Sequence, residues 1–276
     1  MIALLVDDVV RNALREDLGR AGDLTTDAIV PAEAVGEARI VAREAGVVSG
    51  TLTVERTFAL LDPRVKVDIA VRDGGRVAPG SVVATVAGPL RSILTGERVA
   101  LNFLCRLCGI ASATARLVEA VAGTRALIAD TRKTTPGLRA LEKAAVRDGG
   151  GSNHRFGLDD AILIKDNHVA VAGGVAAAIE AARRRAGHLV KIEVEVDTLE
   201  QFDEALAAGA DIVLLDNFAT ADLREAVRRA AGRTLLEASG GIDAATVRSI
   251  AETGVDLISS GALTHSVRIL DLGLDV

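Results

Sequence analysis

The chain has 276 residues, of which 49% are hydrophobic and only 2% aromatic, with neither Trp nor Tyr. This length and apolar content suffice for a large core in one large domain or in two unequal ones. Its 32 basic and 38 acidic residues give a net charge of −6. Together with the scarcity of stacking aromatic side chains, that charge argues against a nucleic-acid partner.

The amino-terminal segment shows no secretory signal, because residues 1–18 carry acidic side chains early and lack a basic start. No uncharged apolar stretch reaches about 18 residues, so we expect neither a membrane-spanning segment nor a membrane partner. We therefore expect a cytoplasmic protein.

The first 100 residues or so predict an α+β domain. Apolar residues have helical spacing from Leu5 to Leu18, where Gly19 suits a helix end. After a predicted polar turn at 22–26, short alternating runs indicate an antiparallel sheet, with strands at 38–43, 47–48, 65–71 and 82–86. Residues 73–86 resemble in shape half of a biotinyl or lipoyl hammerhead sheet, without its carrier lysine.

A long apolar-rich helix is predicted over 91–120, with a break near Gly109, and it can join two domains. Cys105 and Cys108 lie within it at a spacing found in redox pairs and metal sites. Since no second cysteine pair exists and their neighbours Leu104 and Leu107 are apolar, we interpret both thiols as packing groups.

From Ala126 onward, apolar runs alternate with amphipathic helices, which predicts parallel strands. The runs are 126–129, 161–164, 190–194, 211–215, 234–236 and 255–258, and the helices include 170–185, 199–208, 221–230 and 244–252. Units recurring at roughly 20 to 35 residues are typical of (β/α) barrels. Six strands rather than eight favour an incomplete barrel, with an open doubly wound sheet as the alternative.

Polar or small residues follow each apolar run directly. They are Asp130–Lys133, Lys165–Asp166, Glu195–Asp197, Asp216–Asn217, Ser239–Gly241 and Ser259–Ala262. Because the carboxyl ends of parallel strands gather on one face, these residues should form one rim. That rim would carry two cationic, two acidic and two small tips.

Positive charge is concentrated in one region of an otherwise acidic chain. The cations are Arg132, Lys133, Arg155 and Lys165, with His154 among them. Such a cluster is costly to assemble unless an anion lies at its centre. The sequence therefore predicts a small substrate with several negative charges.

The other tips suggest further chemistry. The backbone N–H groups of Ser239–Gly241 and Ser260–Ala262, just ahead of predicted helices, suit a phosphate, although tight turns alone would give the same pattern. Glu195 and Asp216 are candidates to hold Mg²⁺, directly or through water, or to pair with Lys133 or Lys165. His168 and His265 fit either a hydrogen bond at a helix start or a phosphate contact.

The chain resembles the quinolinate phosphoribosyltransferase family, also called nicotinate-nucleotide pyrophosphorylases (carboxylating), nearly from end to end. The motifs that carry the resemblance are Glu16–Gly19 with Gly22–Thr26, Gly96–Arg98, Leu101–Phe103, Thr131–Gly137, Gly149–Arg155, Ile164–His168, Glu193–Asp197, Leu214–Asn217, Ser239–Gly241 and Gly261–Ser266. The departure lies at Cys105 and Cys108, where the family usually has Gln and Ser.

The resemblance implies an amino-terminal α/β sandwich domain, 1–101, which residues 267–276 rejoin, and an incomplete (β/α) barrel, 102–266. It also implies a homodimer, or hexamers built from dimers, in which Arg98 of one subunit enters the partner's barrel site.

The resemblance also implies roles for the site residues. Lys133, Lys165, Glu195 and Asp216 would be catalytic, and Glu195 and Asp216 would face the ribose and a Mg²⁺-diphosphate. The cations Arg132, Lys133, Arg155 and Lys165, with Arg98 of the partner, would surround the two carboxylates of quinolinate, and Thr131 and His154 would line the same pocket. The tips Ser239, Gly240, Gly241, Ser260, Gly261 and Ala262 would take the 5-phosphate.

The activity implied is transfer of phosphoribosyl from 5-phosphoribosyl 1-diphosphate to quinolinate with decarboxylation, which yields nicotinate mononucleotide, diphosphate and CO₂ for NAD biosynthesis. One alternative is a paralogous phosphoribosyltransferase of this fold acting on another acidic ring, such as a molybdenum-operon protein. The others are an aldolase with Lys165 as Schiff base and a non-catalytic phosphometabolite-binding regulator.

Overall fold

The computed structural model describes residues 2–276, without the side chains of Ile2 and Ala3. The chain forms two compact units. The first comprises the residues up to Ala115 together with Thr134–Gly150 and Thr264–Val276, and the second comprises Arg116–Lys133 and Gly151–Leu263. The units thus interleave along the chain, and the domain boundaries predicted from the sequence stay a prediction.

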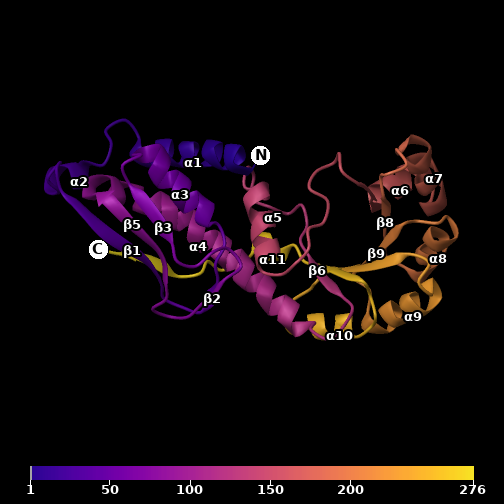
Figure 1. Ribbon diagram of the computed structural model, residues 1–276. Helices are drawn as coiled ribbons and strands as arrows, with labels where there is room; N and C mark the ends of the chain where they lie inside the picture. Colours follow the sequence, from indigo (N-terminus) through magenta and orange to yellow (C-terminus); the bar gives the residue numbers. More distant parts are fainter. Residues whose placement is uncertain (1) are drawn as a thin grey trace. The chain divides into compact units, whose positions relative to one another are not determined.

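The first unit is built on an antiparallel sheet in the order β12-β1-β5-β3 (Figure 1). Its strands are β1 (Val35–Ala42), β3 (Lys66–Ile69), β5 (Val82–Pro89) and β12 (Leu272–Asp275), and β2 (Gly46–Val47) pairs separately with β4 (Arg76–Val77). Helices α1 (Ile2–Leu18), α2 (Leu24–Ile29), α3 (Thr51–Leu61) and α5 (Arg139–Asp148) complete this unit, together with most of α4 (Leu90–Ala120).

Two apolar clusters stabilise the first unit. One packs the sheet against α3 and α4 and includes Ile40, Phe58 and Leu104, all fully buried. The other joins α1, α4 and α5 through residues such as Val10 and Val146. Cys105 and Cys108 belong to the first cluster as free, buried thiols, and burial raises the pKa of both. The interpretation of the two cysteines as packing groups is confirmed.

The polar turn predicted at 22–26 is wrong, because a short helix, α2, begins there. The Asp23 carboxylate accepts the backbone N–H of Thr26 at 3.0 Å, which is the bond of a helix N-cap.

The predicted break near Gly109 is also wrong, since α4 runs from Leu90 to Ala120 without interruption. A Cβ atom at position 109 would lie 2.4 Å from the carbonyl oxygen of Arg268, so the glycine permits a close backbone approach. By length and composition α4 is apolar enough to cross a membrane, but 72% of its most apolar window is buried inside the protein, as in a core helix.

The second unit contains a parallel sheet that follows, among the described residues, the order β6-β11-β10-β9-β8-β7. Its strands are β6 (Leu127–Ala129), β7 (Ile162–Ile164), β8 (Ile192–Val196), β9 (Ile212–Asp216), β10 (Leu235–Ser239) and β11 (Leu257–Ser259). From β7 to β11 the order follows the chain without the reversal of a doubly wound sheet, and β6 pairs with β11 rather than β7. The incomplete barrel is confirmed, and the doubly wound alternative is wrong.

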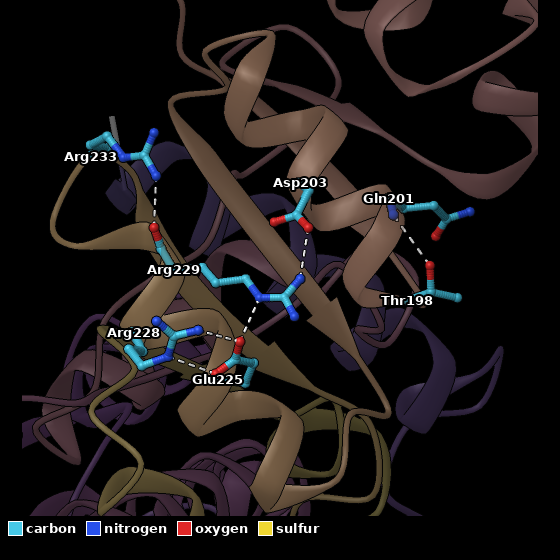
Figure 2. A network of polar contacts seen from close by, with 7 residues as sticks. All are labelled: Thr198, Gln201, Asp203, Glu225, Arg228, Arg229 and Arg233. Atoms are coloured by element: carbon cyan, nitrogen blue, oxygen red, sulfur yellow. Dashed lines mark hydrogen bonds and ion pairs between the residues drawn. The ribbon is translucent and has the colours of Figure 1, made fainter.

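Helices cover the outer face of these strands (Figure 1). They are α6 (Asp166–Ala172), α7 (Val175–Arg185), α8 (Leu199–Ala207), α9 (Thr220–Ala230) and α10 (Val247–Ala251), and a short helix α11 (Ala262–His265) follows β11. The single helix predicted over 170–185 is wrong, because Gly173 and Gly174 have φ values of +86° and +144° and divide it. Arg229 links α8 to α9, donating hydrogen bonds at 2.7 Å to both Asp203 and Glu225 (Figure 2).

An ion pair between a half-buried arginine and a fully buried carboxylate fixes the segment that follows the cationic motif. Arg106 on α4 donates from Nε and Nη2 to one oxygen of Glu142, at 2.9 and 2.6 Å. Its Nη2 also contacts the Thr135 hydroxyl and the Thr264 carbonyl. Glu142 has no solvent exposure and accepts the Thr135 N–H on its other oxygen. The pair therefore holds residue 135 near the start of α5.

Arg106→Ala should lower the free energy of unfolding by about 3–5 kcal/mol, because it leaves the Glu142 carboxylate buried without its cation. Urea denaturation measures this change. The double variant Arg106→Ala/Glu142→Gln should recover part of the loss, since a neutral amide is less costly to bury. If the single and double variants were equally destabilised, the ion pair would not be the cause.

Candidate active site

A cavity of about 240 Å³ lies in the second unit, at the carboxyl ends of its strands. Its lining combines the predicted cations and acids with apolar and small residues, namely Thr131, Arg132, Lys133, His154, Arg155, Leu163, Lys165, Glu195, Leu214, Asp216, Glu237, Ser239 and Ser259. Parallel α/β folds bind their ligands at this end of the strands.

Four predicted cations converge on this cavity. Arg132 and Lys133 follow β6, Arg155 lies in the segment before β7, and Lys165 follows β7. Arg98 lies on α4 in the first unit and does not line this cavity. The predicted convergence of these four cations on one cavity is confirmed, while the role of each cation stays a prediction.

The Arg155 guanidinium lacks one hydrogen-bond partner and lies close to another positive charge. Its Nη1 donates to the Ala161 carbonyl at 3.2 Å, but its buried Nε has no hydrogen-bond partner among the described residues. Burial and the neighbouring Arg132 guanidinium lower the pKa of Arg155. An anion in the cavity would relieve both effects, because it supplies an acceptor and an opposite charge.

The two acidic tips have different partners, because Glu195 pairs with a lysine whereas Asp216 accepts a hydrogen bond from Asn217 Nδ2 at 2.7 Å. Glu195 accepts a hydrogen bond from Lys165 Nζ at 2.5 Å, so the predicted alternative of a lysine ion pair holds for Glu195. The same pair engages the Lys165 ammonium and argues against a Schiff-base role for this lysine. Burial and then the carboxylates of Glu195 and Asp197 raise the pKa of Asp216, while Lys165 and Lys133 lower it.

The two small tips differ in their position relative to the cavity and to the helices that follow them. Ser239 lines the cavity opposite Asp216 in the strand register, and Gly240 has φ +94°. A Cβ atom at 240 would lie 2.0 Å from Asn217 Oδ1, so the turn requires glycine. The expectation that Ser239–Gly241 stands just ahead of a helix is wrong, because α10 begins only at Val247.

Of the second small tip, Ser259 lines the cavity, whereas Ser260, Gly261 and Ala262 do not. Ser260 is buried and donates to the Ile242 carbonyl, while α11 begins at Ala262. His168 Nδ1 accepts the Lys165 N–H at 2.9 Å, which is the helix-start role left open by the sequence.

A buried polar layer, formed by His154, Glu193 and Glu237, lies beneath the arginine and lysine side chains that line the cavity. His154 Nε2 is 3.0 Å from Glu193 Oε2 and 3.7 Å from Glu237 Oε1. Glu193 and Glu237 are only 5% and 2% exposed. Asp130, fully buried at the end of β6, accepts the His154 N–H at 2.8 Å and so fixes the backbone that carries the imidazole.

The tautomer of His154 follows from its hydrogen bonds. Nδ1 accepts the backbone N–H of Arg155 at 2.7 Å, so it carries a lone pair and the ring proton is on Nε2. The ligand atoms of His154, Glu193 and Glu237 lie within 4.8 Å of one another, as in a metal site. A metal ion there would need the Nε2 lone pair, which this tautomer does not offer. We therefore infer that these three side chains hold a proton rather than a metal ion.

Family models match almost the whole chain. The model described as "Quinolinate phosphoribosyl transferase, N-terminal domain" matches residues 23–108, and the model of the C-terminal domain matches residues 110–275. The chain belongs to the quinolinate phosphoribosyltransferase family.

Individual members of the quinolinate phosphoribosyltransferase family are similar along the full chain. A nicotinate-nucleotide pyrophosphorylase [carboxylating] from Mycobacterium leprae is 49% identical, over 98% of this chain and 96% of the relative. The crystal structure of NadC from Streptococcus pyogenes is 45% identical with a TM-score of 0.94, over 98% of this chain and 95% of that one. A nicotinate-nucleotide pyrophosphorylase structure from Francisella tularensis is 40% identical with a TM-score of 0.95, over 99% and 96%.

Sequence reasoning missed Glu193 and Glu237 as residues in or beneath the cavity of this quinolinate phosphoribosyltransferase family member, whereas Ser259 lies at the rim where the sequence places it. The available signal was the period of two along a strand. Glu193 lies two residues before Glu195, and Glu237 lies two before Ser239, so each shares a strand face with a rim residue.

Glu237→Gln is expected to stabilise the protein most above neutral pH. Burial, then the Glu193 carboxylate, and more weakly Asp130, raise the pKa of Glu237 to about 7, while His154 and the Ser259 hydroxyl lower it. Because this pKa exceeds the unfolded value of 4.5, the stability that the group contributes is complete below about pH 4.5 and is lost as pH rises through about 7. The loss amounts to about 3 kcal/mol.

Melting temperatures at about pH 5 and pH 8 test this prediction. Glutamine does not titrate, so the difference between variant and parent should move in favour of the variant at the higher pH. A difference independent of pH would contradict a raised pKa at Glu237.

Proposed function

We propose that this protein transfers phosphoribosyl from 5-phosphoribosyl 1-diphosphate to the ring nitrogen of quinolinate and releases CO₂, forming nicotinate mononucleotide for NAD biosynthesis. The observation that carries the proposal is the convergence of four cations on one cavity in a member of this family. Quinolinate is a dianion that must bind beside a polyanionic donor. Closely spaced cations offset that repulsion and orient the ring nitrogen.

The cations divide the task of recognition. Arg132 and Arg155 present planar guanidinium groups, which suit carboxylates through paired hydrogen bonds. Lys133 and Lys165 act as compact charges beside the carboxylates and the departing diphosphate. A ring with a single carboxylate needs fewer cations, which favours quinolinate over another acidic ring as the substrate.

The acidic tips act on the ribose. As the bond to diphosphate breaks, C1 of the ribose acquires positive charge, and the carboxylates of Glu195 and Asp216 at the same cavity stabilise it. The leaving diphosphate acquires negative charge, which the lysine ammonium groups offset. Ser239, at the end of β10, would contact the 5-phosphate.

Magnesium fits the acidic side of the cavity. Burial and then the carboxylates of Glu195 and Asp197 raise the pKa of Asp216, and a divalent cation would offset both effects. Glu195 and Asp216 would hold Mg²⁺, directly or through water. When bound, the ion neutralises diphosphate charge.

A homodimer with shared sites would give Arg98 a function. Its side chain is 63% exposed, and the ion pair that it forms within the described residues is with the adjacent Glu97, at 3.8 Å. Such a guanidinium is available to an anion on another subunit. We therefore include Arg98 of the partner among the groups that bind the quinolinate carboxylates.

Asp216→Asn should lower kcat about 10²-fold with saturating magnesium and phosphoribosyl donor, because it removes a charge that stabilises the ribosyl cation. Quinolinate affinity, measured by calorimetry, should change little. Asp222→Asn on the outer helix α9 is the matched control and should be neutral. A normal kcat for Asp216→Asn would remove this residue from the chemical step.

Incubation with quinolinate, 5-phosphoribosyl 1-diphosphate and Mg²⁺ tests the function as a whole. Mass spectrometry should detect nicotinate mononucleotide, and CO₂ should appear only when the phosphoribosyl donor is present. Neither product with quinolinate, but turnover of another acidic ring, would instead establish the paralogous activity.

A further inference from the structure

The proposed reaction needs a proton donor. When CO₂ departs from the ribosylated ring, the bond between ring carbon 2 and the carboxylate breaks, and its electron pair stays on that carbon beside the cationic nitrogen. A proton must then form the new C–H bond. Arginine side chains stay protonated in proteins, and Lys165 is engaged by Glu195. The remaining candidate donors in the cavity are the Lys133 ammonium and a carboxyl group that keeps its proton.

Glu237 on β10 meets the geometric requirements. It lines the cavity although it is only 2% exposed. Its Oε1 has no hydrogen-bond partner among residues 2–276, and Oε1 of Glu193 has none either. The two carboxyl groups and the His154 imidazole have ligand atoms within 4.8 Å of one another. Two ionised carboxylates this close and this buried, beside a neutral imidazole, would repel strongly, so the layer retains a proton.

The hydrogen bonds locate that proton on Glu237. His154 Nε2–H points to Glu193 at 3.0 Å, and a donated hydrogen bond favours the ionised form of that carboxyl. Glu237 Oε1 lies farther from Nε2, at 3.7 Å, and is the carboxyl of the two that lines the cavity. The direction of its pKa, raised to about 7, agrees with this assignment.

We infer that Glu237 is the acid that protonates ring carbon 2 after loss of CO₂, with His154 and Glu193 as positioning residues; this inference rests on the proposed function. The O–H bond of Glu237 breaks, its proton forms the C–H bond of nicotinate mononucleotide, and a Glu237 carboxylate remains. Solvent returns the proton once the product leaves the cavity. For each CO₂ released, the reaction consumes one quinolinate and adds one proton to the ring.

The test separates ribosyl transfer from decarboxylation in Glu237→Gln, which keeps the size of the side chain. Quinolinate labelled at its 2-carboxylate reports CO₂, and diphosphate is measured in the same samples. The parent should release one diphosphate per CO₂. In Glu237→Gln the carbanion should recapture CO₂, so CO₂ release should fall about 10²-fold while diphosphate formation falls far less. A mononucleotide that retains both carboxylates should then accumulate, and Glu237→Asp should restore a ratio near one.

A purely structural role would slow both products together. Equal release of diphosphate and CO₂ by Glu237→Gln, at any rate, would overturn the acid role. A parent protein that forms neither product would refute the proposed function instead.

If Glu237→Gln does not fold, single turnovers of the parent decide the question. CO₂ release should slow relative to diphosphate formation as pH rises above about 7, because Glu237, facing His154, Glu193, Asp130 and Ser259, then loses its proton. A ratio independent of pH would overturn the inference.

Discussion

Arg155→Ala should reduce kcat/KM for quinolinate by about 10²- to 10³-fold, which corresponds to about 3–4 kcal/mol of lost binding. The buried Nε of Arg155 has no hydrogen-bond partner among residues 2–276, and burial together with Arg132 lowers the pKa of Arg155, so the free protein already bears the cost of holding this charge. A quinolinate carboxylate would relieve that cost. The alanine variant loses this interaction and gains little in return.

Two further variants test whether this loss is specific to the guanidinium group of Arg155. Arg155→Lys keeps the charge but not the paired hydrogen bonds, and it should recover activity only in part. Arg184→Ala, on the exposed side of α7, removes an arginine from the same unit and should have no effect. Steady-state kinetics with a saturating phosphoribosyl donor measure all three. An unchanged KM and kcat for Arg155→Ala would contradict its role in binding the dicarboxylate.

Arg98→Ala should abolish activity in the purified protein, yet mixing it with Lys133→Ala should restore some. In a mixed dimer with shared sites, one site carries both changes and the other carries neither. Random pairing would then leave about a quarter of all sites intact. Activity is measured after the two variants have been unfolded together and refolded, or co-expressed.

The controls for complementation use each variant alone, which should stay inactive under the same treatment. Arg39→Ala removes an exposed arginine from β1 of the same unit and should keep full activity. An inactive mixture of variants that demonstrably form mixed dimers would exclude a site shared between subunits.

The strands of the second unit are predictable from the sequence because each is buried and therefore apolar. Predicted and observed ends agree within about three residues, so the rim residues after β6, β7, β8 and β9 are also predictable. The strand predicted at 234–236 stops short of β10, which extends to Ser239. That small error hides Glu237, since a charged residue within a strand looks like the residue that ends it.

Other features depend on tertiary contacts that a sequence pattern does not reveal. Gly109 looks like a helix break, but it lies where the Arg268 backbone approaches α4. The proton layer of His154, Glu193 and Glu237 joins residues from β8, β10 and the segment before β7. Spacing within one strand cannot show that these side chains meet, because their proximity arises from the order of the strands in the sheet, where β9 separates β8 from β10.

Side chains of opposite charge lie at different depths of the cavity. Arginine and lysine side chains line its walls, carboxylates stand at the ends of β8 and β9, and a buried carboxyl pair lies with His154 below. A dianion would be attracted by the walls, and a developing cation by the acidic tips. This arrangement explains how an acidic protein can bind two anionic substrates together.

Calorimetric titration of the protein with quinolinate and with nicotinate tests the central claim most directly. Nicotinate lacks the 2-carboxylate, so its binding should be weaker by about 10²-fold or more, and quinolinate affinity should fall as salt is added. Equal affinity for the two acids, or quinolinate binding that Arg155→Ala leaves unchanged, would contradict a cavity built for a pyridine dicarboxylate.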